Sequence, residues 1–240
     1  MNNLKKVGLT ALGTVLVAGS AQAAEMSVSG SASMSYNGQD NNTLGNGWTM
    51  TDSVTFAASG EMDNGMSVAL TLELDGNVMD TRTIALTTDG LGTITFSGDG
   101  ASGPIGSWDD VTPTANEEAH GSTIAGTIAG ATNAAGTNDI FVYDYTLMDG
   151  LALKASYTPS DGATQVESSE DYGFEYTGVD GLKIGAAFGD DNTSATAGES
   201  KSTMYAVYTF DAFSVGYQAS ENDSETASSD IDFTALGVSY

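Results

Sequence analysis

The sequence of 240 residues contains no cysteine, three prolines and one histidine, and its six basic residues include a single arginine. Without cysteine, neither a disulfide framework nor a thiolate metal site can form. The scarcity of proline excludes a proline-rich linker protein. Basic residues are so few beside the 32 acidic ones that the chain will not bind nucleic acid through its own charge. Glycine and small polar residues are abundant instead, which fits many hairpin turns.

Long apolar runs are also missing. After residue 23 there is no stretch of eighteen apolar residues, so no helical membrane span is predicted. Residues 1–23 have the pattern of a secretory signal peptide, with Lys5 and Lys6 before an apolar core and Ala21-Gln22-Ala23 as a cleavage pattern. We therefore expect an exported mature chain, residues 24–240. It keeps all 32 acidic residues and four of the six basic ones, so its formal charge is −28.

Strict alternation is the strongest positive signal. In residues 26–36, MSVSGSASMSY, serine alternates with apolar or small residues, which predicts a strand with one apolar and one hydroxyl face. At about 3.3 Å per residue this strand is about 33 Å long, enough when tilted to cover an outer-membrane apolar band of roughly 25 Å. Similar runs follow at 48–59, 66–74, 82–88 and 93–99. We predict an all-β fold, a closed transmembrane antiparallel β-barrel, because only helices and closed barrels satisfy their backbone in lipid.

The second half of the sequence contains an internal repeat. The pattern Tyr-Thr, Asp-Gly-Leu and alternating apolar residues at 145–157 recurs at 176–188 and, more loosely, at 208–217. Each unit is a strand, a short turn, a returning strand and a longer polar loop, the asymmetry of outer-membrane barrels. The whole chain then has about twelve strands. Aromatic residues near the strand ends predict two interfacial girdles: Tyr145, Tyr176, Tyr208 and Tyr240 at the turn ends, and Tyr36, Tyr157, Phe188 and Tyr217 at the loop ends.

The alternation stops between residues 100 and 138, the longest irregular stretch of the mature chain. A loop of this length inside a compact domain is either functional or evidence of a wrong assignment. Its acidic residues are Asp109, Asp110, Glu117 and Glu118.

The basic residues can be assigned to faces by their place in the alternation. Lys154 and Lys183 share parity with small polar residues, so we expect both to face the interior. Arg82 shares parity with Ile84 and Leu86, which is the lipid side. An arginine at the bilayer midplane costs about 2–4 kcal/mol, so Arg82 must lie at a rim or beside a bulge that turns it inward.

Catalytic and metal sites are weakly supported. His120 is the only histidine and a Gly-x-Ser-x-Gly elbow is missing, so we predict that the chain is not an enzyme. Asp109-Asp110 and Asp190-Asp191-Asn192 could hold Ca²⁺ loosely through oxygen ligands, but no EF-hand pattern is present. Solvated acidic loops account better for these residues, and we expect no metal site and no cofactor.

Taken together, these hairpins resemble the Gram-negative general porins, particularly those of marine alphaproteobacteria. The resemblance rests on the signal peptide and on MSVSGSASMSY, GLGTITFSGDG at 90–100, NDIFVYDYTLMDGLALKASY at 138–157 and DYGFEYTGVDGLKIGAAFG at 171–189. It implies a trimer of barrels, usually of sixteen strands each, whose third external loop folds inward to narrow the pore. Residues 100–138 follow the fifth strand, where that loop falls in the family.

The resemblance also implies roles for residues. The loop acids Asp109, Asp110, Glu117 and Glu118 would form the pore constriction, and the candidates for a basic wall facing them are Lys154, Lys183 and Arg82. We expect an outer-membrane porin, a homotrimer in outer-membrane lipid that passes small hydrophilic solutes and ions and prefers cations. Twelve strands leave open either a short relative or a sixteen-stranded parent truncated at its C-terminal end. The rival is a soluble secreted or surface β-sandwich, an adhesin or structural protein.

Overall fold

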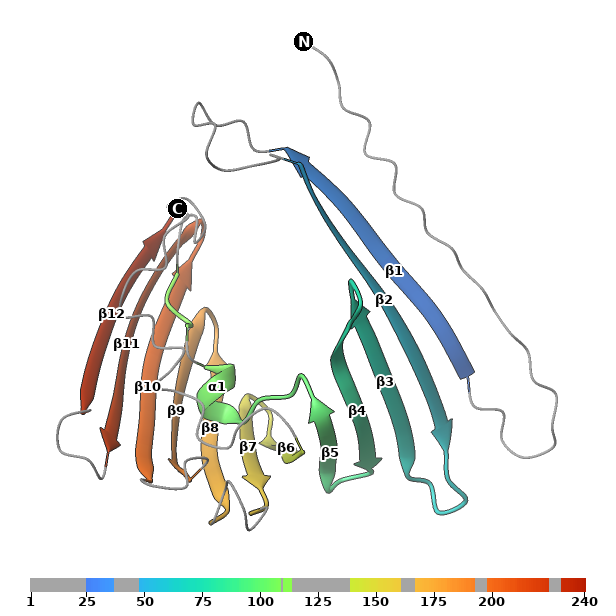
Figure 1. The fold of residues 1–240 in the computed structure, drawn as a ribbon. Helices are drawn as coiled ribbons and strands as arrows, with labels where there is room; N and C mark the ends of the chain where they lie inside the picture. Colours follow the sequence, from blue (N-terminus) through green and yellow to red (C-terminus); the bar gives the residue numbers. More distant parts are fainter. Residues whose placement is uncertain are drawn as a thin grey trace.

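The computed structural model describes residues 25–36, 48–108, 110–113, 139–160, 167–192, 198–224 and 230–240. Twelve strands form one antiparallel sheet in sequence order (Figure 1). A single turn of helix, α1 (Pro104–Ser107), interrupts the strands. No helix in these ranges is long and apolar enough to cross a membrane. The strands are β1 (Glu25–Tyr36), β2 (Trp48–Glu61), β3 (Ser67–Asp75), β4 (Val78–Thr88), β5 (Gly92–Asp99), β6 (Ile140–Met148), β7 (Leu151–Thr158), β8 (Ser169–Val179), β9 (Leu182–Asp191), β10 (Glu199–Phe210), β11 (Phe213–Ser224) and β12 (Ile231–Ser239).

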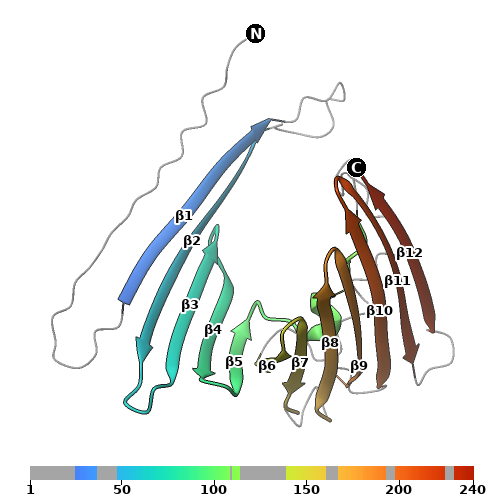
Figure 2. The ribbon, with the colours of Figure 1, turned by 180° about the vertical axis from the view of Figure 1, so that it is seen from behind.

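The sheet is strongly curved around an open interior, and its two edges do not meet. Each strand pairs with its neighbours in sequence, and within the described residues β1 and β12 are the unpaired edges. Both views show these strands on opposite sides of a wide opening (Figures 1 and 2). The all-β fold, the antiparallel order and the count of twelve are confirmed. The expected closure of twelve strands into a ring is not observed, because the curvature of the sheet does not bring its edges within pairing distance.

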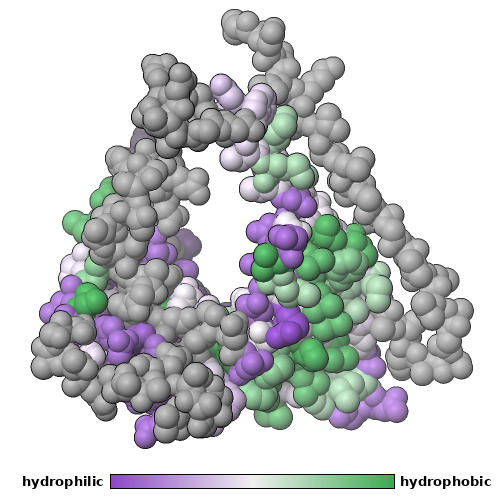
Figure 3. Space-filling view, viewed as in Figure 1, coloured by the Kyte–Doolittle hydropathy of each residue, from purple (hydrophilic) through white to green (hydrophobic). Residues whose placement is uncertain are grey.

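The two faces of the sheet differ as the alternation predicts. On β1 and β2 the concave face carries hydroxyl pairs, Ser31–Ser53 at 3.1 Å, Ser33–Thr51 at 2.6 Å and Ser35–Thr49 at 2.5 Å. We call these three pairs the hydroxyl ladder. The convex face carries exposed apolar side chains instead, and hydrophobic residues gather on the side of β2–β4 in the space-filling view (Figure 3).

The internal repeat is present in the backbone as well as in the sequence. Gly150 and Gly181 close the β6–β7 and β8–β9 turns with φ values of 76° and 73°, which glycine adopts without strain. Each turn is hydrogen-bonded to the next unit: Thr177 N donates to Gly150 O at 2.7 Å, and Thr209 N donates to Gly181 O at 2.8 Å. The repeat therefore builds one rim of short, mutually bonded turns.

Candidate functional site

The first part of the long loop lies on the concave face. Residues 101–108 and 110–113 run along the inner wall, and α1 contacts β7, β8, β9 and β10 (Figures 1 and 2). Pro104 and Ile105 are buried, and Ile105 forms a small apolar cluster with Ala187 and Trp108. A second buried pair on this face, Ile140 and Val142, packs against Ala101 of the loop, so two small apolar clusters hold the loop segment to the wall.

Two buried polar side chains of the wall bind the loop backbone. Asp171 on β8 accepts a hydrogen bond from Ile105 N at 3.1 Å and another from the Ser156 hydroxyl. Gln218 on β11 donates to Trp108 O at 2.6 Å and accepts from Val111 N at 3.1 Å. Both wall side chains have 0% exposure. Because an unpaired buried polar group costs about 1–3 kcal/mol, these bonds tie the loop path to the wall.

Glycines of the wall make room for the loop. A side chain at Gly173 on β8 would collide with Trp108 and Pro104. The space beside Gly216 on β11 and Gly237 on β12 is likewise filled, because Pro113 lies against both glycines. The loop segment thus lies against glycines on β8, β11 and β12.

The four predicted constriction acids are mostly beyond the described residues. Asp110 is described and exposed, close to the Gln218 contacts of the loop. Asp109, Glu117 and Glu118 lie outside the described residues, as do His120 and the signal peptide of residues 1–23. A constriction formed by the four acids therefore stays a prediction.

Lys154 and Lys183 lie on the concave face, each beside a carboxylate. Lys183 Nζ is 3.3 Å from Glu175 Oε2. Lys154 is the direct cross-strand partner of Asp144, and its Nζ donates to Ser107 Oγ of α1 at 2.7 Å. The two lysines are therefore part of a mixed-charge wall that also contacts the loop, and they do not form a separate basic patch.

Arg82 does not join this wall. It pairs with Leu72 of β3, so its side chain is on the convex face, and Nη2 donates to Gly98 O at 3.1 Å. The β4–β5 register shifts between Arg82 and Thr83, beside the last residue of β5, Asp99. The expectation of a lumenal Arg82 is corrected by this register: the bulge lies at the rim but leaves the arginine on the outer face, bonded to a backbone carbonyl.

Sequence reasoning missed several residues of the inner wall. Tyr205 donates its hydroxyl to Glu175 Oε2 at 2.5 Å, and its ring meets the Trp108 ring edge-on with centroids 5.9 Å apart. Lys201 is buried between Asp191 at 2.6 Å and Glu199 at 3.2 Å. Parity alone could have placed Glu175, Lys201 and Tyr205 inside, because each alternates with convex residues. The burial of Tyr205 depends on Trp108 of the loop and that of Lys201 on neighbouring strand residues, which parity does not predict.

Two of the candidate Ca²⁺ ligands, Asp191 and Asn192, bind neighbouring protein groups. Asp191 is engaged by Lys201, and Asn192 donates its side-chain amide to Ser168 O at 2.8 Å. Within the described part of the chain, no three acidic or histidine side chains are grouped to hold a metal ion.

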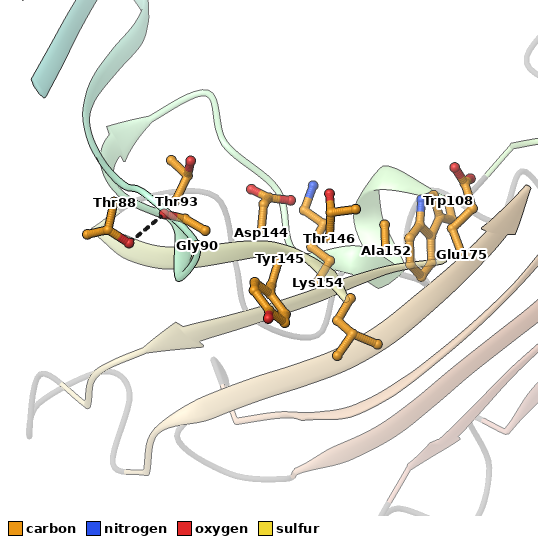
Figure 4. Close-up of a pocket in the computed structure, with 12 residues that line it drawn as sticks. Thr88, Gly90, Thr93, Trp108, Asp144, Tyr145, Thr146, Ala152, Lys154 and Glu175 are labelled. Atoms are coloured by element: carbon orange, nitrogen blue, oxygen red, sulfur yellow. Dashed lines mark hydrogen bonds between the residues drawn. The ribbon is translucent and has the colours of Figure 1, made fainter. Parts of the chain in front are cut away.

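A cavity of about 550 Å³ is lined by Trp108 and by residues of the β4–β5 turn, β6, β7 and β8. In the close-up, Asp144 and Lys154 point toward the loop, Tyr145 points to the opposite side, and Trp108 lies beside Glu175 (Figure 4). A curved antiparallel sheet with an apolar outside, a polar inside and an inward loop defines a membrane channel of the outer-membrane barrel class.

The chain belongs to the Gram-negative porin family, whose family model matches residues 8–240. It is accordingly an outer-membrane porin. No curated protein matches the sequence.

Several solved structures share the fold. In-vitro folded OmpT, an outer membrane protein of Vibrio cholerae, has a TM-score of 0.59 at 17% identity, over 89% of this chain and 70% of that one. The anion-selective porin from Comamonas acidovorans has a TM-score of 0.55 at 13% identity, over 89% and 74%. Salmonella typhi OmpF in complex with daunomycin has a TM-score of 0.52 at 12% identity, over 90% and 73%. At these identities the likeness establishes the fold alone.

Proposed function

We propose that this porin is a water-filled channel for the passive diffusion of small hydrophilic solutes, and that it prefers cations. The observation that carries the proposal is the path of residues 101–108 and 110–113 along the concave face, held by Asp171 and Gln218. A segment fixed there narrows the interior without filling it, since the described concave positions of β1–β3 are exposed or half-buried.

The concave face of β1–β3, which we call the uncovered wall, supports passive diffusion over specific binding. Its concave side chains are mostly serine and threonine, many of them paired across strands as in the hydroxyl ladder. Hydroxyl groups hydrate a path, whereas a specific channel lines its path with aromatic or charged groups. Solutes passing this wall are selected by size and charge.

Charge balance supports the cation preference. Lys183 is paired with Glu175 and Lys154 lies opposite Asp144, so neither lysine opposes the loop acids as an isolated charge. The formal charge of residues 24–240 is −28. Low-dielectric walls focus the field of the remaining acids on the aperture, which concentrates cations there.

We also propose a homotrimer in outer-membrane lipid, in line with the resemblance of the sequence to general porins. The exposed apolar side chains of the convex face support contact with lipid and with neighbouring copies. Chemical cross-linking in detergent should give a species of three times the chain mass, whereas monomer alone contradicts this part of the proposal.

Liposome swelling tests the channel itself. Reconstituted full-length protein should admit small sugars and amino acids at rates that fall with solute size. Flux no greater than that of empty liposomes would contradict the proposed diffusion channel.

Reversal potentials across planar bilayers in a KCl gradient test selectivity. Neutralising Asp109, Asp110, Glu117 and Glu118 to the corresponding amides should lower the cation preference. A matched control neutralises four exposed turn aspartates and should change the cation preference little. These are Asp63, Asp149, Asp180 and Asp211. The preference should weaken in concentrated salt, since the Debye length falls from about 10 Å at 0.1 M to about 3 Å at 1 M. The proposal that the loop acids select cations is contradicted if the native protein prefers anions. It is also contradicted if neutralising the turn aspartates has the same effect as neutralising the loop acids.

A further inference from the structure

Four adjacent strands carry concave charges of alternating sign. Asp144 on β6 is the direct partner of Lys154 on β7. The partner of Lys154 on β8 is Gly173, two residues from Glu175, and the partner of Glu175 on β9 is Gly185, two residues from Lys183. Direct and diagonal neighbours on one face lie within about 5–8 Å, so the four charges form a continuous diagonal toward the short-turn rim.

The loop places an aromatic ring over this diagonal. Trp108 lines the 550 Å³ cavity together with Asp144, Lys154 and Glu175 (Figure 4). A second cavity of about 350 Å³, beside Gly106 and Ser107, shares Asp144 and Lys154 with the first. Asp144 and Lys154 thus line both cavities.

The charged groups differ in how far the protein already uses them. Glu175 Oε2 is occupied by the Tyr205 hydroxyl and Lys183. Lys154 uses one of its three ammonium donors on Ser107. The Asp144 side chain is exposed and makes no hydrogen bond or ion pair with the described residues. A ligand can therefore bring a donor to Asp144 and an acceptor to Lys154.

We propose that this cavity is a binding subsite for small zwitterions that carry both an ammonium and a carboxylate group, such as free amino acids. The ammonium binds Asp144, the carboxylate binds Lys154, and the carbon skeleton lies against the Trp108 ring. An anion is repelled by Asp144 and Glu175, a simple cation is repelled by Lys154, and an uncharged sugar satisfies neither charge. The subsite rests on the proposed channel function.

The test uses reconstituted full-length protein in planar bilayers and measures how solutes interrupt the ion current. The zwitterion is L-glutamine. Its matched probes are 4-aminobutanamide, which lacks the carboxylate, glutaramate, which lacks the ammonium, and L-arabinose, which is uncharged. L-Glutamine should interrupt the current at a lower concentration than any of the three.

Variants then separate the two ends of the ligand. Asp144→Asn should raise the half-blocking concentration of L-glutamine about three- to tenfold, the effect of losing one charge-assisted hydrogen bond in a wet site. Lys154→Gln keeps a hydrogen-bond donor for Ser107. It should raise the half-blocking concentrations of L-glutamine and glutaramate but not that of 4-aminobutanamide. The control Glu73→Gln removes one concave carboxylate from β3, outside the cavity, and should leave the half-blocking concentration unchanged.

Each other outcome decides against the subsite. Equal block by L-arabinose means that size alone is sensed, and tighter block by 4-aminobutanamide means an acid-only cation site. An equal shift in Glu73→Gln means a general field effect. Absence of ion conductance in every variant and in the native chain would instead contradict the channel function, so the two failures are distinguishable.

Discussion

The two halves of the sheet are built from the same alternating strands, yet their concave faces differ. On β1–β3 every described concave residue is exposed or half-buried, and the hydroxyl ladder is typical of this wall. On β7–β11 the concave face holds buried polar groups such as Asp171, Lys201 and Gln218. Residues 101–108 and 110–113 lie against this second concave face. A polar strand face thus stays a wet surface until it is covered. Most of the covered polar groups then have buried partners, the described exceptions being Thr158 Oγ1 and Asn222 Oδ1.

The largest expected effect concerns the buried cation of the covered half. Lys201→Met leaves Asp191 and Glu199 without their ammonium partner, and breaking a buried ion pair on one side costs about 3–5 kcal/mol. Denaturant unfolding of the reconstituted protein measures the loss. The control Lys183→Met removes a lysine whose side chain is 46% exposed and should cost under about 1 kcal/mol. Equal losses of unfolding free energy in the two variants would contradict the expected difference between buried and solvent-exposed charges.

A somewhat smaller effect is expected for the loop anchor. Asp171→Ala leaves Ile105 N and the Ser156 hydroxyl without their acceptor, at a cost of about 1–3 kcal/mol for a buried unpaired group. Because the loop is released from β8, single-channel conductance should rise and become noisier. The control Glu73→Ala removes a half-buried carboxylate from the uncovered wall and should leave the conductance noise unchanged. Unaltered conductance in Asp171→Ala would show that the anchor does not set the aperture.

Steric filling of the loop path should have an effect of similar or smaller size. Gly173→Val places a side chain where Trp108 and Pro104 lie, and overpacking costs typically about 1–3 kcal/mol. Trp108 fluorescence should report a changed environment. In Ala69→Val, an exposed concave position of β3, the same kind of enlargement should be tolerated. A Trp108 signal identical to that of the native chain would contradict the contact with Gly173.

The smallest effect is expected in the hydroxyl ladder. Ser33→Ala removes one exposed hydroxyl pair with Thr51, and surface substitutions of this kind usually change stability by less than about 0.5 kcal/mol. The midpoint of heat-modifiable gel mobility should stay unchanged. A loss comparable to that of Asp171→Ala would mean that the uncovered wall is also held by specific polar contacts.

The fold was largely predictable because its determinants are local. The hairpin around Asp63-Asn64-Gly65 and the turns at Gly150 and Gly181 follow from turn chemistry, and the faces of Lys154 and Lys183 follow from parity. Arg82 was the ambiguous position, since a bulge can move a residue to either face. Only the observed pairing with Leu72 decided it.

The site was less predictable because its contacts are distant in sequence. Ile105 meets Asp171 across 66 residues, and Trp108 meets Gln218 across 110. Nothing in the alternation around Asp171, Gly173 or Gln218 distinguishes a position under the loop from one facing water. The mixed-charge wall was missed for the same reason, since Asp144, Lys154 and Glu175 become neighbours only through strand register.

The sequence by itself determined the strands, their order, and the division into an apolar and a polar face. Each of these depends on period-two alternation and on turn residues a few positions apart. The tertiary structure alone decided which stretch of polar wall is buried, and that β1 and β12 remain apart. Both depend on the path of one loop and on the summed curvature of twelve strands, which are global properties that no local pattern encodes.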